Sequence, residues 1–132
     1  MEERPHASRS HRNLIVWQRG MALCRQIYRC TQAMPSGELY GLTGQMRRAS
    51  VSVPSNIAEG FGREGQKEFL RHLRIAQGSL NELATQHELA TSMDMIPSDP
   101  TTIRLIEETD LVLRGFIRSV KQSLRKTPSP SA

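Results

Sequence analysis

Four basic residues near the C-terminal end are spaced for contacts with phosphates. Arg114, Arg118, Lys121 and Arg125 follow one another at intervals of four, three and four, which places them on one face of a helix. Such a ridge can neutralise several phosphates of a nucleic acid, and arginine can do so with two parallel hydrogen bonds. Arg47 is expected to add to this binding surface. A solvated helix face without any partner remains the alternative.

The excess positive charge is confined to the same end of the chain. Residues 1–113 hold 13 basic and 13 acidic residues, which cancel, whereas residues 114–132 hold five basic residues and no acid. This asymmetry accounts for the whole net charge of +5 and favours a polyanionic partner. Aromatic residues are few and fall mostly at expected core positions, so stacking on bases is not expected.

A second feature is the dense run of small, polar and charged residues between positions 41 and 63. Pro54 lies in its middle, and since proline lacks an N–H we expect one kinked helix there; the alternative is two short helices. Polar residues recur on one face at intervals of three and four: Gln45, Arg48, Ser52, Ser55 and Glu59. A different face carries the apolar row: Met46, Ala49, Val53 and Ile57. Because the apolar row is needed for the core of its own chain, we expect the polar face to meet a neighbouring subunit.

No group of residues has the spacing of a catalytic or metal site. His72 and His87 are fifteen residues apart on one expected helix, so about 22 Å separates them, too far for one metal ion. Cys24 and Cys30 match no zinc or redox spacing and are expected to be buried free thiols. The glycine-rich stretch after Glu59 lacks the ending of a phosphate-binding loop. We therefore expect a protein that is not an enzyme and needs no metal or cofactor.

Four helical segments must position these residues, and no strand pattern occurs. Their expected ranges are 13–34 with Asn13 as the cap, 41–61, 66–93 and 101–126 with a threonine cap. Short connections predict an all-α, antiparallel, up-down-up-down four-helix bundle. We expect a mobile N-terminal arm over 1–12, the bundle domain over 13–126 and a disordered tail over 127–132.

The first segment carries two adjacent rows at intervals of three and four, which predict a wide buried face. One row is Leu14, Trp17, Met21, Cys24 and Tyr28, and the other is Val16, Gly20, Leu23, Ile27, Cys30 and Met34.

Apolar spacing also predicts how the third and fourth segments pack. The third carries a heptad-like seam: Phe69, Leu73, Ala76, Leu80, Leu83, His87 and Ala90. Gly78, also in the third segment, is expected to permit close approach of another backbone. The inward row of the fourth segment is expected to be Ile103, Ile106, Leu113, Ile117, Val120 and Leu124. Asp110 interrupts that row, so it should pair across the bundle or lie at a subunit contact.

The start of the chain is polar, and nowhere do about 18 apolar residues run together, as a membrane span requires. We therefore expect a soluble cytoplasmic protein without a membrane partner.

The run QMRRASVSVPSNIAEG, from Gln45 to Gly60, resembles the signature of the bacterial four-helix bundle family encoded in intervening sequences of 23S rRNA genes. Stretches 14–18, 67–71 and 76–83 are similar to other parts of that family, and the likeness covers about residues 13–120. The motif's polar members, carried over by position, are Arg47, Arg48, Ser52, Asn56 and Glu59. The expected structural or subunit-contact set takes all of these except Arg47 and adds four more residues: Gln45, Pro54, Ser55 and Gly60.

The resemblance implies an antiparallel bundle that assembles as a ring-like homopentamer. Its relatives include the accessory variability proteins of diversity-generating retroelements, which bind a reverse transcriptase and nucleic acid. Charge and resemblance together predict a non-enzymatic homo-oligomer that binds structured RNA or an RNA–DNA hybrid. It would act as a reverse-transcriptase accessory or with a 23S rRNA intervening sequence. The alternative is a protein-interaction scaffold that contacts no nucleic acid.

Overall fold

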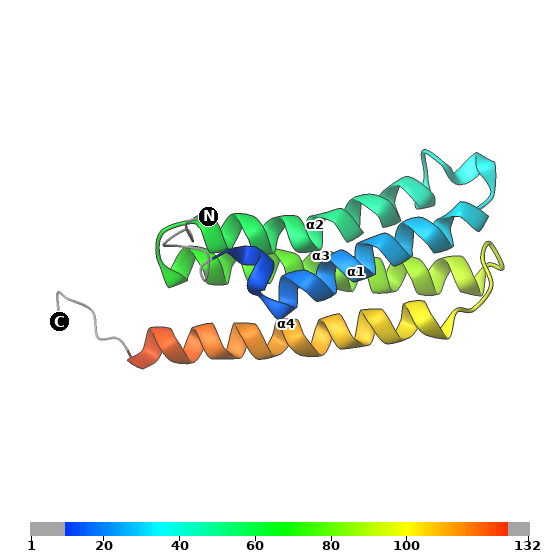
Figure 1. Cartoon of the computed structure of the whole chain (residues 1–132). Helices are drawn as coiled ribbons and strands as arrows, with labels where there is room; N and C mark the ends of the chain where they lie inside the picture. Colours follow the sequence, from blue (N-terminus) through cyan, green and yellow to red (C-terminus); the bar gives the residue numbers. More distant parts are fainter. Residues whose placement is uncertain (1–9, 127–132) are drawn as a thin grey trace, which may run out of the picture.

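The computed structural model describes residues 10–126, which form four long helices (Figure 1). Their bounds are α1 Ile15–Cys30, α2 Leu42–Gly62, α3 Gln66–Ser92 and α4 Pro100–Lys126. Successive helices run in opposite directions, and α1 and α3 each pack against both α2 and α4. Residues 10–126 contain no strand. The predicted all-α, up-down-up-down four-helix bundle is confirmed; apart from residues 10–12, the predicted arm and tail lie outside the described residues.

The first helix is shorter at both ends than its sequence pattern predicts. Asn13 belongs to a short 3-10 turn, and Leu14 takes the N-cap position without a side-chain hydrogen bond, so the cap prediction for Asn13 was wrong. At the other end α1 passes into a second 3-10 turn, Thr31–Ala33. Pro35 explains the stop, because the residue before a proline is driven out of the helical region, and Met34 has a ψ angle of 147°.

The predicted core rows of α2 and α3 are confirmed. All seven seam residues of α3 are buried, and so are the four apolar residues of α2. In α1 the row containing Val16, Leu23 and Ile27 faces the bundle axis, whereas the neighbouring row is only partly buried and its last member, Tyr28, is 43% exposed. A helix in a four-helix bundle has one fully covered stripe, and its flanks stay accessible.

The inward face of α4 differs from the predicted row. Leu113 and Val120 are buried, but Ile103 is 41% exposed, and threonines at 102 and 109 take fully buried positions. Burial of these hydroxyls is tolerated because each is hydrogen-bonded; Thr109 Oγ1 donates to Leu105 O at 2.7 Å. The prediction counted only apolar residues, and it therefore placed Ile103 in the buried stripe at the start of α4 where Thr102 is buried instead.

The second helix continues through Pro54 as one element, so the alternative of two short helices is excluded. Pro54 is buried and faces α1, where a Cβ added to Gly20 would lie 3.5 Å from the proline ring. That distance is an ordinary van der Waals contact, so α1 packs closely on Pro54 without requiring a glycine at position 20. Gly60 and Gly62 belong to α2, so the only glycine in the loop before α3 is Gly65, whose φ is +90°.

The structure also tests several smaller predictions. Cys24 and Cys30 are free, as expected, but only partly buried. A Cβ at Gly78 would meet nothing within 4 Å, so the close approach predicted there does not occur within the chain. Asp110 does pair across the bundle, since its Oδ1 accepts from Gln77 Nε2 at 2.8 Å. Within residues 10–126, none of the helices carries an apolar stretch long enough to cross a bilayer.

Candidate nucleic-acid and subunit surfaces

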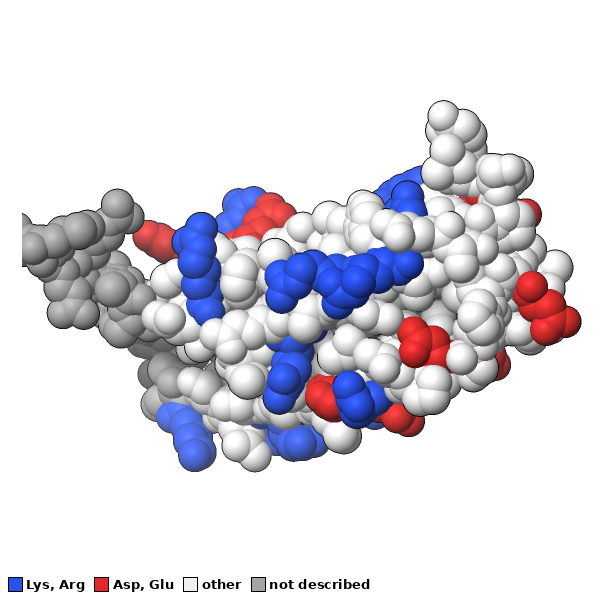
Figure 2. Space-filling view, turned by 45° about the vertical axis from the view of Figure 1, so that its right-hand side comes forward, with Lys and Arg blue, Asp and Glu red and all other residues white. Residues whose placement is uncertain are grey.

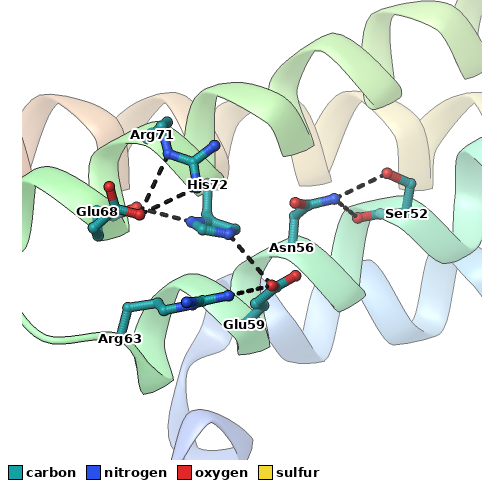
Figure 3. Close-up of polar contacts among 7 residues, drawn as sticks. All are labelled: Ser52, Asn56, Glu59, Arg63, Glu68, Arg71 and His72. Atoms are coloured by element: carbon teal, nitrogen blue, oxygen red, sulfur yellow. Dashed lines mark hydrogen bonds and ion pairs between the residues drawn. The ribbon is translucent and has the colours of Figure 1, made fainter.

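Part of the α2 motif lies at the seam between α2 and α3. Ser52 Oγ is 2.7 Å from Ser79 Oγ of α3. Asn56 Nδ2 donates to Ser52 O at 2.9 Å and to Ser52 Oγ at 3.0 Å, which orients the hydroxyl toward its partner helix (Figure 3). The polar side chains of this seam thus make their hydrogen bonds within one chain. Ser52 and Asn56 therefore serve mainly to pack α2 against α3.

Gly60 explains why α2 and α3 can come so close at the end of the motif. A Cβ at Gly60 would lie 2.4 Å from the Cβ of His72 and 3.3 Å from Cδ1 of Phe69. No heavy atom can occupy that space, because ordinary van der Waals contacts between carbon atoms are 3.5–4.0 Å. Gly60 is therefore a packing residue within the chain, and it is the glycine of close approach that the sequence had placed at Gly78.

Glu59 forms a small charged network where α2 meets α3 (Figure 3). Its Oε1 accepts from Arg63 at 2.9 Å and lies 3.8 Å from His72 Nε2. The hydrogen bond from Arg63 lowers the pKa of Glu59 below its usual value. His72 Nδ1 lies 3.0 Å from the carbonyl of Glu68, which can only accept, so the proton belongs on Nδ1. The imidazole then pairs with Glu59 as an ion only when it is protonated.

Four of the five members of the polar face are exposed, namely Gln45, Arg48, Ser55 and Glu59. Gln45 and Arg48 line a hollow of about 200 Å³ on the α2–α3 surface, together with Ser52 and Glu82. Glu59 is also accessible, with its side chain 53% exposed. The surface available to a second subunit is therefore narrower than the predicted face and consists of these exposed side chains.

The four predicted phosphate contacts do form one ridge on the second half of α4, which we call the α4 basic ridge. Arg114, Arg118 and Arg125 are exposed and Lys121 is partly exposed. Three of them line an open hollow of about 350 Å³ with Gln77 of α3. Arg114 is paired with Asp110 at 2.9 Å, so this cation is partly neutralised.

Arg47, predicted to join this ridge, lies far from it. It is in the second turn of α2, at the end of the bundle where α1 connects to α2, whereas α4 ends at the opposite end (Figure 1). Its guanidinium carbon lies 5.0 Å from the centre of the Tyr28 ring, and its Nε donates to Thr31 Oγ1 at 2.9 Å. Arg47 therefore belongs to a separate basic surface.

That second basic surface follows α1 and the start of α2, and the sequence analysis did not identify it. Residues 10–58 contain six arginines and a single acid, Glu38. The exposed arginines of this α1–α2 basic surface are Arg12, Arg25, Arg29 and Arg48, beside the half-buried Arg47. Figure 2 shows a run of basic side chains along one face, bordered by uncharged surface. A charge count over segments of helix length, rather than over the whole of residues 1–113, would have found it.

A partly buried polar cluster connects α1 to the start of α4. Asp99 is the cap of α4: its Oδ1 accepts from Thr101 N at 3.0 Å and its Oδ2 from Thr102 Oγ1 at 2.5 Å. Gln26 Nε2 donates to the same carboxylate at 3.0 Å and to Thr102 Oγ1 at 3.1 Å. These hydrogen bonds lower the pKa of Asp99. The predicted threonine cap was wrong, because the capping residue is the aspartate that precedes the helix.

A family model described as 23S rRNA-intervening sequence protein matches residues 12–115, from the turn before α1 into the second half of α4. The chain belongs to the 23S rRNA-intervening sequence protein family. No individual curated protein matches the sequence.

The residues matched by the family model include some of the candidate surfaces of this 23S rRNA-intervening sequence protein and exclude most of another. The α2 motif, Gly60 and the α1–α2 basic surface lie within the matched residues. Of the α4 basic ridge only Arg114 does, since Arg118, Lys121 and Arg125 follow the end of the match. Among residues 10–126 no group of three or more His, Cys, Asp or Glu is arranged to hold a metal ion.

Proposed function

We propose that this 23S rRNA-intervening sequence protein is a non-enzymatic protein that binds structured RNA or an RNA–DNA hybrid. The supporting observation is the segregation of charge into two surfaces. One is the α1–α2 basic surface, and the other is the α4 basic ridge, where residues 114–126 hold five basic residues and no acid. Cations that lack neighbouring acids retain their attraction for phosphate, so both surfaces suit a polyanion.

Acidic side chains near these surfaces largely have partners within the chain. Glu38 Oε1 accepts the backbone N–H of Leu42 at 3.1 Å and so caps the start of α2. Asp110 holds Arg114 but does not reach the rest of the ridge. A nucleic acid lying on either surface would therefore meet arginine and lysine with few competing carboxylates.

The finer assignment follows from the resemblance of the central motif. We propose that the protein serves either as an accessory to the reverse transcriptase of a diversity-generating retroelement or together with a 23S rRNA intervening sequence. A basic helical surface can serve either role through phosphate contacts, which position a nucleic acid without reading its sequence.

Charge reversal on the ridge tests the proposal. We expect Arg118→Glu with Arg125→Glu to weaken binding of a fluorescent RNA hairpin more than tenfold and to reduce the slope of log affinity against log salt by about two, because two phosphate contacts are lost. The measurement is a fluorescence-anisotropy titration at several salt concentrations, repeated with an RNA–DNA hybrid.

The matched control reverses two arginines that already have acidic partners. Arg63→Glu with Arg104→Glu gives the same change in net charge, but these side chains pair with Glu59 and Glu108. Its affinity should change far less than that of the ridge variant. If the wild-type protein binds no RNA even at low salt, nucleic-acid binding is wrong and the protein-interaction scaffold is favoured. Equal losses in the two variants would rule out the ridge as the binding surface.

We also propose that the protein assembles as a homopentamer through the exposed part of the α2 polar face. Light scattering should give a mass of about 75 kDa, five times the chain mass of 14.9 kDa. Ser55→Arg should lower this mass without loss of helicity, because Ser55 is exposed and a long charged side chain would block close approach. Gln122→Arg on α4 is the control and should leave the mass unchanged. A wild-type monomer at micromolar concentration would disprove the assembly.

A further inference from the structure

The two tyrosines of the chain both lie outside the core, at the end of the bundle where α1 connects to α2. Tyr40 is 97% exposed and Tyr28 is 43% exposed. Leu39, beside Tyr40, is 46% exposed. The expectation that aromatic residues are mostly taken up by the core therefore fails at both positions. An almost fully exposed tyrosine ring offers both faces for stacking.

Arg47 stands next to the Tyr28 ring with its guanidinium held in place. Its carbon lies 5.0 Å from the centre of the Tyr28 ring, within the range of a cation–π contact. The hydrogen bond from Nε to Thr31 Oγ1 fixes the plane of the group. Within residues 10–126 its two terminal nitrogens make no hydrogen bond or ion pair, so they remain available to an anion.

A hollow of about 260 Å³ joins Arg47 to the exposed segment. Its lining includes Thr43 and Leu39, and it is large enough to admit a phosphate group. Thr43 is 3% exposed, and its hydroxyl has no hydrogen-bond partner within the described part of the chain. This hydroxyl is itself inaccessible, so the groups that a ligand in the hollow can reach are Arg47 and the exposed residues of the lining, Gln32, Ser36 and Leu39.

The surrounding charge favours nucleic acid over a second copy of this chain. The only acid between residues 10 and 58 is Glu38, whose carboxylate is bonded to the start of α2. The rest of this region is the α1–α2 basic surface, which repels the same surface of another copy but attracts phosphates. Figure 2 shows basic side chains at the base of the projecting segment at the upper right.

We propose that this end of the bundle binds an unpaired stretch of RNA, with a phosphate held by Arg47 and a base stacked on Tyr40. The proposal rests on the nucleic-acid binding proposed above and adds the single-stranded character of the ligand. Stacking requires a free base face, which a duplex offers only at its ends, whereas every unpaired base has one. The site would hold loops or ends of a folded RNA, while the arginines along α1 bind the adjoining backbone.

Tyr40→Ala tests this site with little risk to the fold, because the side chain is almost fully exposed. The probes are an unstructured 12-nucleotide single-stranded RNA and a blunt RNA duplex of the same length, measured by anisotropy at one low salt concentration. We expect Tyr40→Ala to weaken single-strand binding about tenfold, as loss of one stacked base predicts, and to change duplex binding less than twofold. Tyr40→Trp should retain the wild-type affinity because indole also stacks.

Ile75→Ala is the matched control, since Ile75 is also an exposed apolar side chain at 41% exposure and lies in the first half of α3, away from the end of the bundle where α1 connects to α2 (Figure 1). Unchanged single-strand affinity in Tyr40→Ala, or equal loss on both probes, overturns the stacking site. A change in the mass of the assembly in Tyr40→Ala also overturns it, because the segment then contacts a second copy. If wild type binds neither probe, the proposed function itself fails; if it binds both and Tyr40→Ala has no effect, only this inference fails.

Discussion

Gly60→Ala is expected to lower the free energy of unfolding by about 1–3 kcal/mol, the usual range for an overpacked core. The added Cβ would lie 2.4 Å from the Cβ of His72, and neither atom can move without its helix backbone. The loss should appear even though alanine favours a helix over glycine by about 1 kcal/mol. α2 and α3 would have to separate at the end of the motif. Urea denaturation followed by circular dichroism measures the effect.

Gly78→Ala makes the identical chemical change in the middle of α3 and serves as the control. A Cβ there meets nothing within 4 Å, so only the helix preference remains, and stability should rise by about 0.5–1 kcal/mol. The two variants should therefore move in opposite directions. If Gly60→Ala is as stable as Gly78→Ala, the close approach of α2 and α3 at His72 is wrong.

Asp99→Ala is expected to cost about 2–4 kcal/mol of unfolding free energy, because two effects add. The variant removes the cap of α4, and it leaves the fully buried hydroxyl of Thr102 without the acceptor that Asp99 provides at 2.5 Å. Gln26 also loses one of its two acceptors on this side of α1. Chemical denaturation at neutral pH gives the value.

Asp99→Asn separates the contribution of the negative charge to stability from that of the hydrogen bonds. Asparagine also caps helices, so this variant should lose much less stability than Asp99→Ala. Since the pKa of Asp99 is lowered by its hydrogen bonds, its contribution is present above pH 3.8 and is lost as the pH falls through the lower folded-state pKa. Asp99→Asn should lack that component of the acid transition. An Asp99→Ala protein as stable as wild type would show that the cluster does not stabilise the bundle.

The helix periods of α2 and α3 could be predicted from sequence because a buried stripe repeats every three or four residues whatever its neighbours are. The same rule failed at Ile103, where threonines that satisfy their own hydroxyls replaced apolar residues at the bundle axis. It also placed Tyr28 in a core row, although that residue lies on the flank of α1. Whether a residue lies on the exposed flank of a helix depends on which helix packs alongside it. The spacing of apolar residues does not contain this information.

The candidate surfaces, like the core, could be predicted from the sequence only in part. The spacing of Arg114, Arg118, Lys121 and Arg125 was enough to place them on one ridge, because a helix fixes which residues share a face. The sequence could not show that Arg47 lies at the other end of the bundle beside Tyr28, because that contact joins two different helices. The pairing of Arg114 with Asp110 is different, since the two residues are four positions apart on one helix and their spacing already allows the contact.

The sequence by itself determined the four helices, their order, the α4 basic ridge and the family motif, since all of these depend on local spacing and residue type. Only the tertiary structure decided what the motif does within the chain. It places Ser52 against Ser79 and Gly60 against His72, so much of the motif packs α2 on α3. It also brings Arg47 of α2 against Tyr28 and Thr31 at the end of α1. Packing between helices sets these neighbours, because each depends on the distance and rotation of two elements rather than on the pattern of either one.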